Sequence, residues 1–387
     1  MIEIMSGTMV TMLFGHHPDI QISRHVMGMV NFHQLKLGRA SMTSIWWVAA
    51  AVLALQMSSA GAQGSLPLIK IVATGGTIAN TPSGRLHAGE VLEAIPDLKK
   101  VARLEVEEII RVGSSSITVA NWLTLSKRIN EIFAKEPEVK GVVVTHGSNT
   151  VEETGYFLSL TVKSEKPLVL TAAQRQFSTL SSDSPKNFLQ AVRVAVSDQA
   201  KGKGALIVAN DSIHAARDVT KLISYRLETY SSKDLGALGF VDEDQVTFYR
   251  TPVKKHTTAS PFDVSEMQKL PRVDIIYSYA DADGVLIEAA VEHGKADGIV
   301  IAAFPTGSPT PAMATAIAKV IAKGVPVVMT NRGGMGRVRD TRARPGAERS
   351  AHVWGDNLTP QKARILLMLA LTKTKDPKEL QRIFDEY

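Results

Sequence analysis

The sequence predicts an α/β fold divided into two domains, and three observations support this prediction. Short apolar runs rich in β-branched residues alternate along the chain with longer amphipathic patterns of helical spacing. The chain has 387 residues, which is enough for two hydrophobic cores. One polar, proline-punctuated stretch, residues 251–272, lacks regular periodicity and is typical of a connection between domains.

The apolar runs have the length and composition of buried strands. They are residues 68–73, 141–145, 167–171, 205–209, 273–278, 298–302 and 325–330. Helical patterns lie between many of them, at 119–134, 151–163, 186–198, 285–293, 311–323 and 359–372. Apolar strands separated by amphipathic helices indicate parallel sheets covered on both faces. We therefore expect a larger N-terminal domain of flavodoxin- or Rossmann-like type over 63–250 and a smaller C-terminal α/β domain over 273–387.

The N-terminus has the features of a leader with a secretory signal. Lys36 and Arg39 precede the apolar run 45–55, and the sequence Ala-Gly-Ala at 60–62 provides a cleavage site of small residues. The apolar run is shorter than the ~20 residues of a membrane-spanning helix, although an uncleaved anchor is the alternative. We expect cleavage that removes residues 1–62, a periplasmic or secreted protein, and no stable membrane association afterwards.

Composition excludes several kinds of chemistry. Hydrophobic residues make up 44% of the chain and charged residues 21%, as in soluble globular proteins. There is no cysteine, which rules out disulfides, zinc-thiolate sites and thiol nucleophiles. The formal net charge is only +6, and arginines gather in the glycine-rich stretch 332–349. That stretch lacks aromatic residues for base stacking, so we expect a solvated loop and no nucleic-acid partner, with an anion-facing lid as the alternative.

Two segments resemble each other and could form one pocket. Residues 71–77 (IVATGGT) and 142–150 (VVVTHGSNT) are both predicted strands that end in hydroxyl side chains and glycine. Ligands of doubly wound folds bind outside the carboxyl ends of strands. Neither segment has the glycine pattern of a dinucleotide site or a P-loop. Each is therefore either a catalytic loop or a tight turn.

A threonine nucleophile in the first segment would need a nearby base, because a free hydroxyl is almost never ionised at neutral pH. His146 has no recognisable Ser/His/Asp pattern around it, and no G-x-S-x-G motif occurs. A lysine amine whose pKa is lowered by burial can serve as the base. Lys221 follows the predicted strand 205–209 and could reach the same sheet edge, although a surface role is the alternative.

Several separated motifs together resemble the bacterial type II L-asparaginases and the related glutaminase-asparaginases. They are ATGGTIA (73–79), VVTHGSNTVEETGYFL (143–158), NDSIHAARDVTK (210–221), RTPVKKHTTASPFDVS (250–265) and LTPQKARILLMLALTKTKDP (358–377). The resemblance covers about 67–387. It implies a two-domain α/β fold, a homotetramer built from close dimers, and hydrolysis of a small-molecule side-chain amide with no metal and no cofactor.

The resemblance also assigns roles to single residues. Thr77 is implied as the nucleophile that forms an acyl-enzyme, Ser148 as the second catalytic hydroxyl, and Lys221 as the lysine that assists it. Backbone amides near these hydroxyls would supply the oxyanion donors. The residues implied in substrate binding are Ser114, Ser115, Asn149, Gly76, Gly147, Ala173 and Ser308, the last from a partner subunit.

The chain departs from the family pattern mainly where substrate is recognised. Asn149 stands where the family has an aspartate, and Ser115 stands where it has a glutamine. The loop 79–90 lacks the family's tyrosine, for which Tyr225 or Tyr230 could substitute, and Arg-Ala-Arg occupies 342–344 where a partner's glutamate is expected.

A buried ammonium without a counter-charge is unfavourable by several kcal/mol. We expect hydrolysis of L-asparagine, with L-glutamine second. The alternatives are an amide without a free α-ammonium, a weakly active or inactive relative, and a periplasmic solute-binding protein.

Overall fold

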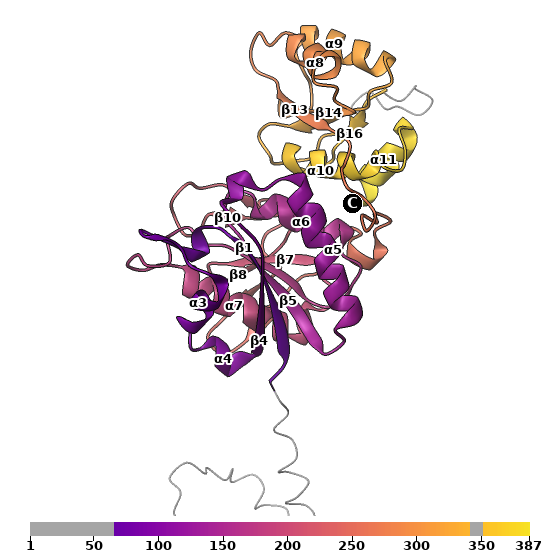
Figure 1. The fold of residues 1–387 in the computed structure, drawn as a ribbon. Coiled ribbons are helices and arrows are strands. Elements are labelled where there is room, and N and C mark those ends of the chain that lie inside the picture. Colours follow the sequence, from indigo (N-terminus) through magenta and orange to yellow (C-terminus); the bar gives the residue numbers. More distant parts are fainter. Residues whose placement is uncertain (1–65, 341–350) are drawn as a thin grey trace, which may run out of the picture. The chain divides into compact units, whose positions relative to one another are not determined.

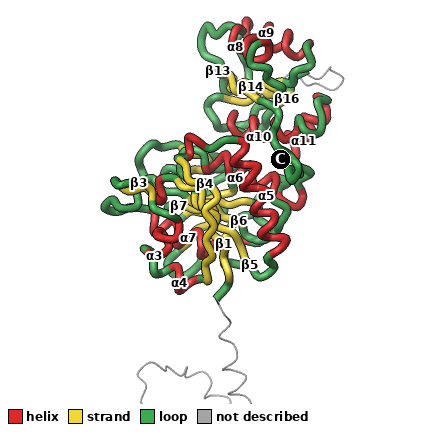
Figure 2. Tube along the Cα trace, in the orientation of Figure 1, coloured by secondary structure: helices red, strands yellow, loops and turns green. Residues whose placement is uncertain are grey.

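The computed structural model describes residues 66–340 and 351–387, and the predicted leader lies outside them. Strands form the centre of the larger domain, with helices around them (Figures 1 and 2). The order of the strands in this sheet is β12-β11-β8-β7-β6-β5-β1-β4. Strands β4, β1, β5, β6 and β7 are parallel, and β8, β11 and β12 continue the sheet in antiparallel pairs. The strands are β1 Leu68–Gly75, β4 Arg103–Val112, β5 Val139–Thr145, β6 Leu168–Thr171, β7 Ala205–Ala209, β8 Ser212–Ala215, β11 Gly239–Val241 and β12 Val246–Phe248.

The parallel part of this sheet has the flavodoxin-like order, in which the second strand of the chain lies outside the first. From β1 the chain turns to β4 on one side, and it then crosses to β5 on the other side of β1. The crevice between β1 and β5 is therefore the topological switch point, where doubly wound folds bind their ligands. The segments 74–77 and 145–150 leave these two strands at that point.

Alternating strand residues explain why helices cover both faces of the sheet. On β5, Val142 and Val144 belong to one hydrophobic cluster, whereas Val143 belongs to another. A strand buried on both sides needs apolar residues at every position, as observed. Helices α5 and α6 cover the first face and α3, α4 and α7 the second. The helices are α3 Ala88–Glu93, α4 Leu98–Val101, α5 Val119–Lys135, α6 Val151–Thr161 and α7 Ser184–Val196.

The smaller sheet is fully parallel, with the order β13-β14-β15-β16. Helices α8 and α9 pack on one face around Ile299, Ile301 and Met329. Helix α10 packs on the other face, where it meets Val300 and Val328. The elements are β13 Val273–Tyr277, α8 Val285–Glu292, β14 Gly298–Ala303, α9 Pro311–Ala322, β15 Val327–Asn331, β16 Val353–Trp354, α10 Pro360–Ala370 and α11 Pro377–Glu386. The fold class is thus two parallel-dominated α/β domains, as predicted.

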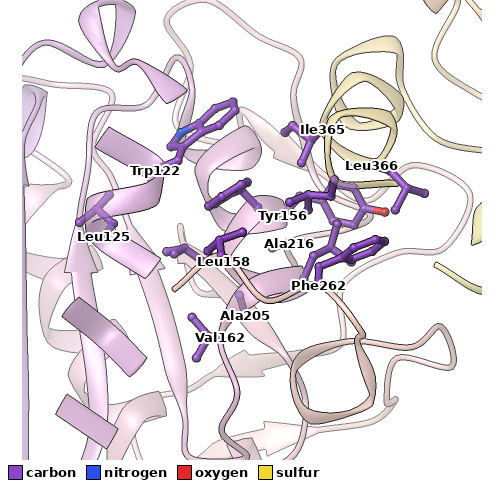
Figure 3. Close-up of a cluster of buried hydrophobic side chains, with 14 of the residues drawn as sticks. Trp122, Leu125, Tyr156, Leu158, Val162, Ala205, Ala216, Phe262, Ile365 and Leu366 are labelled. Atoms are coloured by element: carbon purple, nitrogen blue, oxygen red, sulfur yellow. The ribbon is translucent and has the colours of Figure 1, made fainter. Parts of the chain in front are cut away.

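One hydrophobic cluster continues from the first domain into helix α10. Tyr156 on α6 is fully buried in the same cluster as Ile365 and Leu366 on α10 (Figure 3). Phe157, its neighbour on α6, is fully buried in this cluster too. Phe262, from the predicted connecting segment, also belongs to this cluster, and its ring centroid lies 5.6 Å from that of Tyr387. Helix α10 is apolar on most of its surface because both α6 and the small sheet pack against it.

The remaining described elements are short. The hairpin β9 Thr220–Lys221 and β10 Tyr230–Ser231 follows β8, and the pair β2 Asn80–Thr81 and β3 Gly84–Arg85 follows the short turn Thr77–Ala79. Of the arginine-rich stretch, Arg332, Arg337 and Arg339 are exposed, and 341–350 lies outside the described residues. Within residues 66–340 and 351–387, no helix is long and apolar enough to cross a membrane.

Candidate active site

The loops that leave β1 and β5 are in direct backbone contact. Gly76 has φ +89°, and a Cβ added there would lie 2.4 Å from the Cα of Gly147. Only glycine combines this backbone conformation with so close an approach. The Gly76 amide also donates to the carbonyl of Val112 at the end of β4, at 3.1 Å. Thr77, the predicted nucleophile, directly follows Gly76 and is partly exposed.

Ser148 and Lys221 are brought together although they lie far apart in sequence. The Lys221 Nζ atom is 2.7 Å from the Ser148 Oγ atom and 3.1 Å from the Asn149 Oδ1 atom. Ser148 is buried and Lys221 is partly buried, on strand β9. The second predicted hydroxyl and the predicted lysine therefore form a hydrogen-bonded pair, and Asn149 completes it with a neutral amide.

Burial lowers the pKa of the Lys221 amine, and the carboxylate of Glu152 opposes this effect. Glu152 lies in the first turn of α6, and its Oε2 atom accepts a hydrogen bond from the Lys221 backbone amide at 3.2 Å. Burial in turn raises the pKa of Glu152. A lysine with a lowered pKa is a better proton acceptor near neutral pH than an exposed one.

A second lysine near Glu152 comes from the C-terminal domain. Lys362 on α10 is 1% exposed, and it donates to the carbonyl oxygens of Arg217, at 2.8 Å, and Val219. Burial lowers its pKa to about 8, although Glu152 acts in the opposite direction. Lys362 thus places a buried positive group near the carboxylate of Glu152, and it ties the segment just before strand β9 to helix α10.

Ser114, predicted to bind substrate, is also part of the β5 loop's support. Its Oγ atom accepts from the Asn149 amide at 3.3 Å, and its carbonyl accepts from the Thr150 hydroxyl at 2.8 Å. Gly147 faces Ser114 so closely that a Cβ there would lie 2.6 Å from the Ser114 Oγ atom. Because Ser114 accepts from the loop, its own hydroxyl hydrogen remains available to a ligand.

Tyr230 approaches the same loop from the hairpin. Its hydroxyl donates to the Ser148 carbonyl at 3.1 Å, and in the hairpin Tyr230 lies directly opposite Lys221. Burial raises the pKa of this phenol well above its usual value, so it stays protonated. Tyr225, the other candidate for the missing tyrosine, is 89% exposed.

His146 is a buried support of the loop. Its Nε2 atom is 2.9 Å from the Thr154 hydroxyl, which accepts from the Trp122 indole at 2.8 Å. Its Nδ1 atom is 2.9 Å from the Gly147 carbonyl. With a neutral ring, the Trp122 indole donates to the Thr154 hydroxyl and that hydroxyl donates to the His146 Nε2 atom. The proton of the neutral ring is then on Nδ1, which donates to the Gly147 carbonyl. Burial lowers the pKa of His146 to about 4, in agreement with a neutral ring.

Three other predicted binding residues make no hydrogen bond to Ser148 or Lys221 in the described part of the chain. Ala173 is buried and follows β6, the neighbour of β5, at the same edge of the sheet. Ser115 is exposed beside Ser114. Ser308 is exposed in the loop after β14, where its carbonyl accepts from the Phe304 amide. No contact joins Ser308 to Ser148 or Lys221 within the described part of this chain.

Sequence reasoning missed the supporting residues of the site. Glu152 looks like an ordinary acidic residue in a helix's first turn, where it also suits the helix dipole. Gln174 donates to the carbonyls of Ile223, Ser224 and Arg226 and so holds the hairpin tip, and no local pattern marks it. The described residues contain no group of three or more His, Asp or Glu side chains placed to hold a metal ion.

Comparison with known proteins defines the class to which this fold and site belong. The family described as "Asparaginase, N-terminal" matches residues 68–254, and "Glutaminase/Asparaginase C-terminal domain" matches residues 272–384. The chain is 42% identical to L-asparaginase 2 of Bacillus subtilis over 85% of this chain and 89% of that protein. It is 35% identical to the glutaminase-asparaginase of Pseudomonas fluorescens over 87% of this chain and 94% of that one. The chain therefore belongs to the asparaginase family.

A periplasmic relative and a solved structure agree with this assignment. The probable periplasmic L-asparaginase of Haemophilus influenzae is 39% identical over 83% of this chain and 93% of its own. The crystal structure of a probable cytoplasmic L-asparaginase from Campylobacter jejuni superposes with a TM-score of 0.77 at 41% identity, and it covers 83% of this chain and 99% of that one. The match spans both α/β domains.

Proposed function

We propose that this protein hydrolyses the side-chain amide of L-asparagine, with L-glutamine as a second substrate, to the acid and ammonia. One observation carries the proposal: the Lys221 amine lies 2.7 Å from the Ser148 hydroxyl at the switch point of the sheet, beside the loop that bears Thr77. An amine of lowered pKa against a hydroxyl is a proton-accepting pair.

The proposed reaction has two halves. The Thr77 hydroxyl attacks the amide carbon, its proton passes to the Ser148–Lys221 pair, and the same pair returns a proton to the leaving nitrogen as ammonia departs. Water then attacks the acyl ester, and Thr77 recovers its proton as the acid leaves. Backbone amides of the two touching loops would stabilise the oxyanion, at about 3 kcal/mol for each donor.

The test is ammonia release from a panel of amides. We expect Thr77→Ala to abolish release, Thr77→Ser to retain part of it, and Thr315→Ala, a change on the exposed face of α9, to leave it unchanged. Release that survives Thr77→Ala would refute the assignment of the nucleophile. No release from any amide by the wild-type protein would favour a silent relative or a solute-binding protein.

A second candidate substrate is an amide without a free α-ammonium. The observation in its favour is that Asn149 is neutral and its Oδ1 atom already accepts from Lys221. The nearby carboxylate, that of Glu152, is buried and accepts from the Lys221 backbone amide. Kinetics on asparagine, its N-acetyl derivative and its deaminated analogue test this. A strong preference for free asparagine would refute it, and Asn149→Asp should improve use of substrates with an α-ammonium.

Location and assembly follow as further parts of the proposal. We expect export with removal of residues 1–62, as the basic flank, the apolar run and the small-residue cleavage site indicate. A homotetramer would bring Ser308 of one subunit to the site of another, in keeping with its exposed position after β14. N-terminal sequencing of the exported protein and light scattering test these two expectations.

A further inference from the structure

Two side chains of one hairpin reach the same residue of the catalytic loop. Lys221 and Tyr230 lie directly opposite each other in the antiparallel pair β9–β10, so their side chains leave the same face of the hairpin. Lys221 bonds to the Ser148 hydroxyl, and Tyr230 bonds to the Ser148 carbonyl. Ser148 is therefore held through its side chain and its main chain from a single element.

The peptide group that follows Ser148 is held at both ends. Its carbonyl oxygen accepts from the Tyr230 phenol at 3.1 Å, and its N–H, that of Asn149, donates to the Ser114 hydroxyl at 3.3 Å. The carbonyl and N–H of one trans peptide point in opposite directions from a rigid plane. Two bonds on opposite sides therefore oppose rotation of the plane, and they fix the main chain from which the Ser148 side chain extends toward Lys221.

We infer that Tyr230 is a positioning residue, which holds the Ser148 peptide so that the Ser148 hydroxyl faces Lys221. The inference rests on the proposed amide hydrolysis for its kinetic consequence. The phenol acts as a donor and not as a base, because its hydroxyl already donates to a carbonyl and its raised pKa keeps it protonated. It is not a catalytic residue, since it acts through Ser148 and not on the substrate.

The substitution Tyr230→Phe removes one oxygen atom and keeps the ring. The Ser148 carbonyl then loses its donor, and the peptide is held from the Ser114 side alone. A lost hydrogen bond of this kind corresponds to about a tenfold change in rate when it positions a reacting group. We expect kcat to fall about tenfold with KM within about twofold, because the substrate's own contacts are unchanged.

Tyr249→Phe is the matched control, because it makes the same chemical change at an exposed tyrosine outside the hairpin. We expect it to leave kcat and KM unaltered. A purely structural role for Tyr230 would lower the melting temperature and leave kcat intact. A kcat of Tyr230→Phe within twofold of wild type, or an equal loss in Tyr249→Phe, would overturn the inference.

A readout that needs no turnover separates this inference from the proposed function. Hydrogen exchange of the Asn149 amide should be faster in Tyr230→Phe than in wild type, because the peptide plane can rotate out of its bond to Ser114. Unchanged exchange would refute the positioning role even if the enzyme were active. Faster exchange in a protein that hydrolyses no amide would support the positioning role while the proposed function fails.

Discussion

Gly147→Ala should disable the site although no predicted catalytic residue is itself substituted. The added Cβ would lie 2.6 Å from the Oγ atom and 2.7 Å from the Cβ atom of Ser114. Carbon atoms in contact are normally about 3.5–4.0 Å apart, so relief requires a movement of about 1 Å. Ser114 cannot simply withdraw, because it is bonded to the Asn149 amide and the Thr150 hydroxyl of the same loop.

The strain therefore falls on the loop that carries Ser148. Overpacking of this kind costs about 1–3 kcal/mol of folding free energy. A misplacement of about 1 Å at a reacting group lowers the rate about 10²-fold. We expect kcat for ammonia release to fall by about that factor, and urea unfolding to show the stability loss.

The control for this experiment is Gly89→Ala on helix α3, where the added Cβ meets no atom within 4 Å. This change should leave activity unaltered and stabilise the helix by about 0.5–1 kcal/mol. A Gly147→Ala protein with kcat within twofold of wild type and unchanged stability would show that a methyl group fits between Gly147 and Ser114, and it would refute this prediction.

Three further predictions follow from the charged and buried groups. Lys221→Met should lower kcat about 10²–10⁴-fold, which is the usual contribution of a positioned base. Lys186→Met, the same change at an exposed lysine, should leave kcat unaltered. Equal kcat values for the two variants would contradict the base role of Lys221. Glu152→Gln should move the acid limb of the pH–kcat profile to lower pH. The Glu152 carboxylate favours the charged form of Lys221, so a neutral glutamine at this position should lower the pKa of the lysine further. A shift of the acid limb to higher pH would contradict this. Stability should fall as the pH drops from 6.5 to about 4, since His146 and His214 have pKa values of about 4 in the folded protein and bind protons more readily when unfolded, by roughly 3 kcal/mol each. Unfolding free energies at several pH values test this, and His214→Gln should flatten the slope; an unaltered slope would count against it.

The regular elements of the fold were largely predictable because their pattern is local. The predicted strand 141–145 is observed as Val139–Thr145, and the predicted helix 119–134 as Val119–Lys135. The edge strand Arg103–Val112 was missed, since charged residues interrupt its apolar positions and half of its residues are exposed. An edge strand is defined by the neighbour to which it bonds, here β1, and the sequence of such a strand need not be apolar.

The sequence by itself determined the fold class, the family and the residues implied in chemistry, because periodicity and motifs are written in contiguous stretches. The pairing of Lys221 with Ser148 was inferred only by analogy, and the tertiary structure gave it a distance of 2.7 Å. Only the tertiary structure showed which residues support the site. The Tyr230 hydroxyl donates to the Ser148 carbonyl, and the Glu152 carboxylate accepts from the Lys221 backbone N–H. These contacts join residues roughly 70–80 positions apart. One partner in each contact is a backbone group, and because every residue has such groups, no sequence motif identifies the ones that are used.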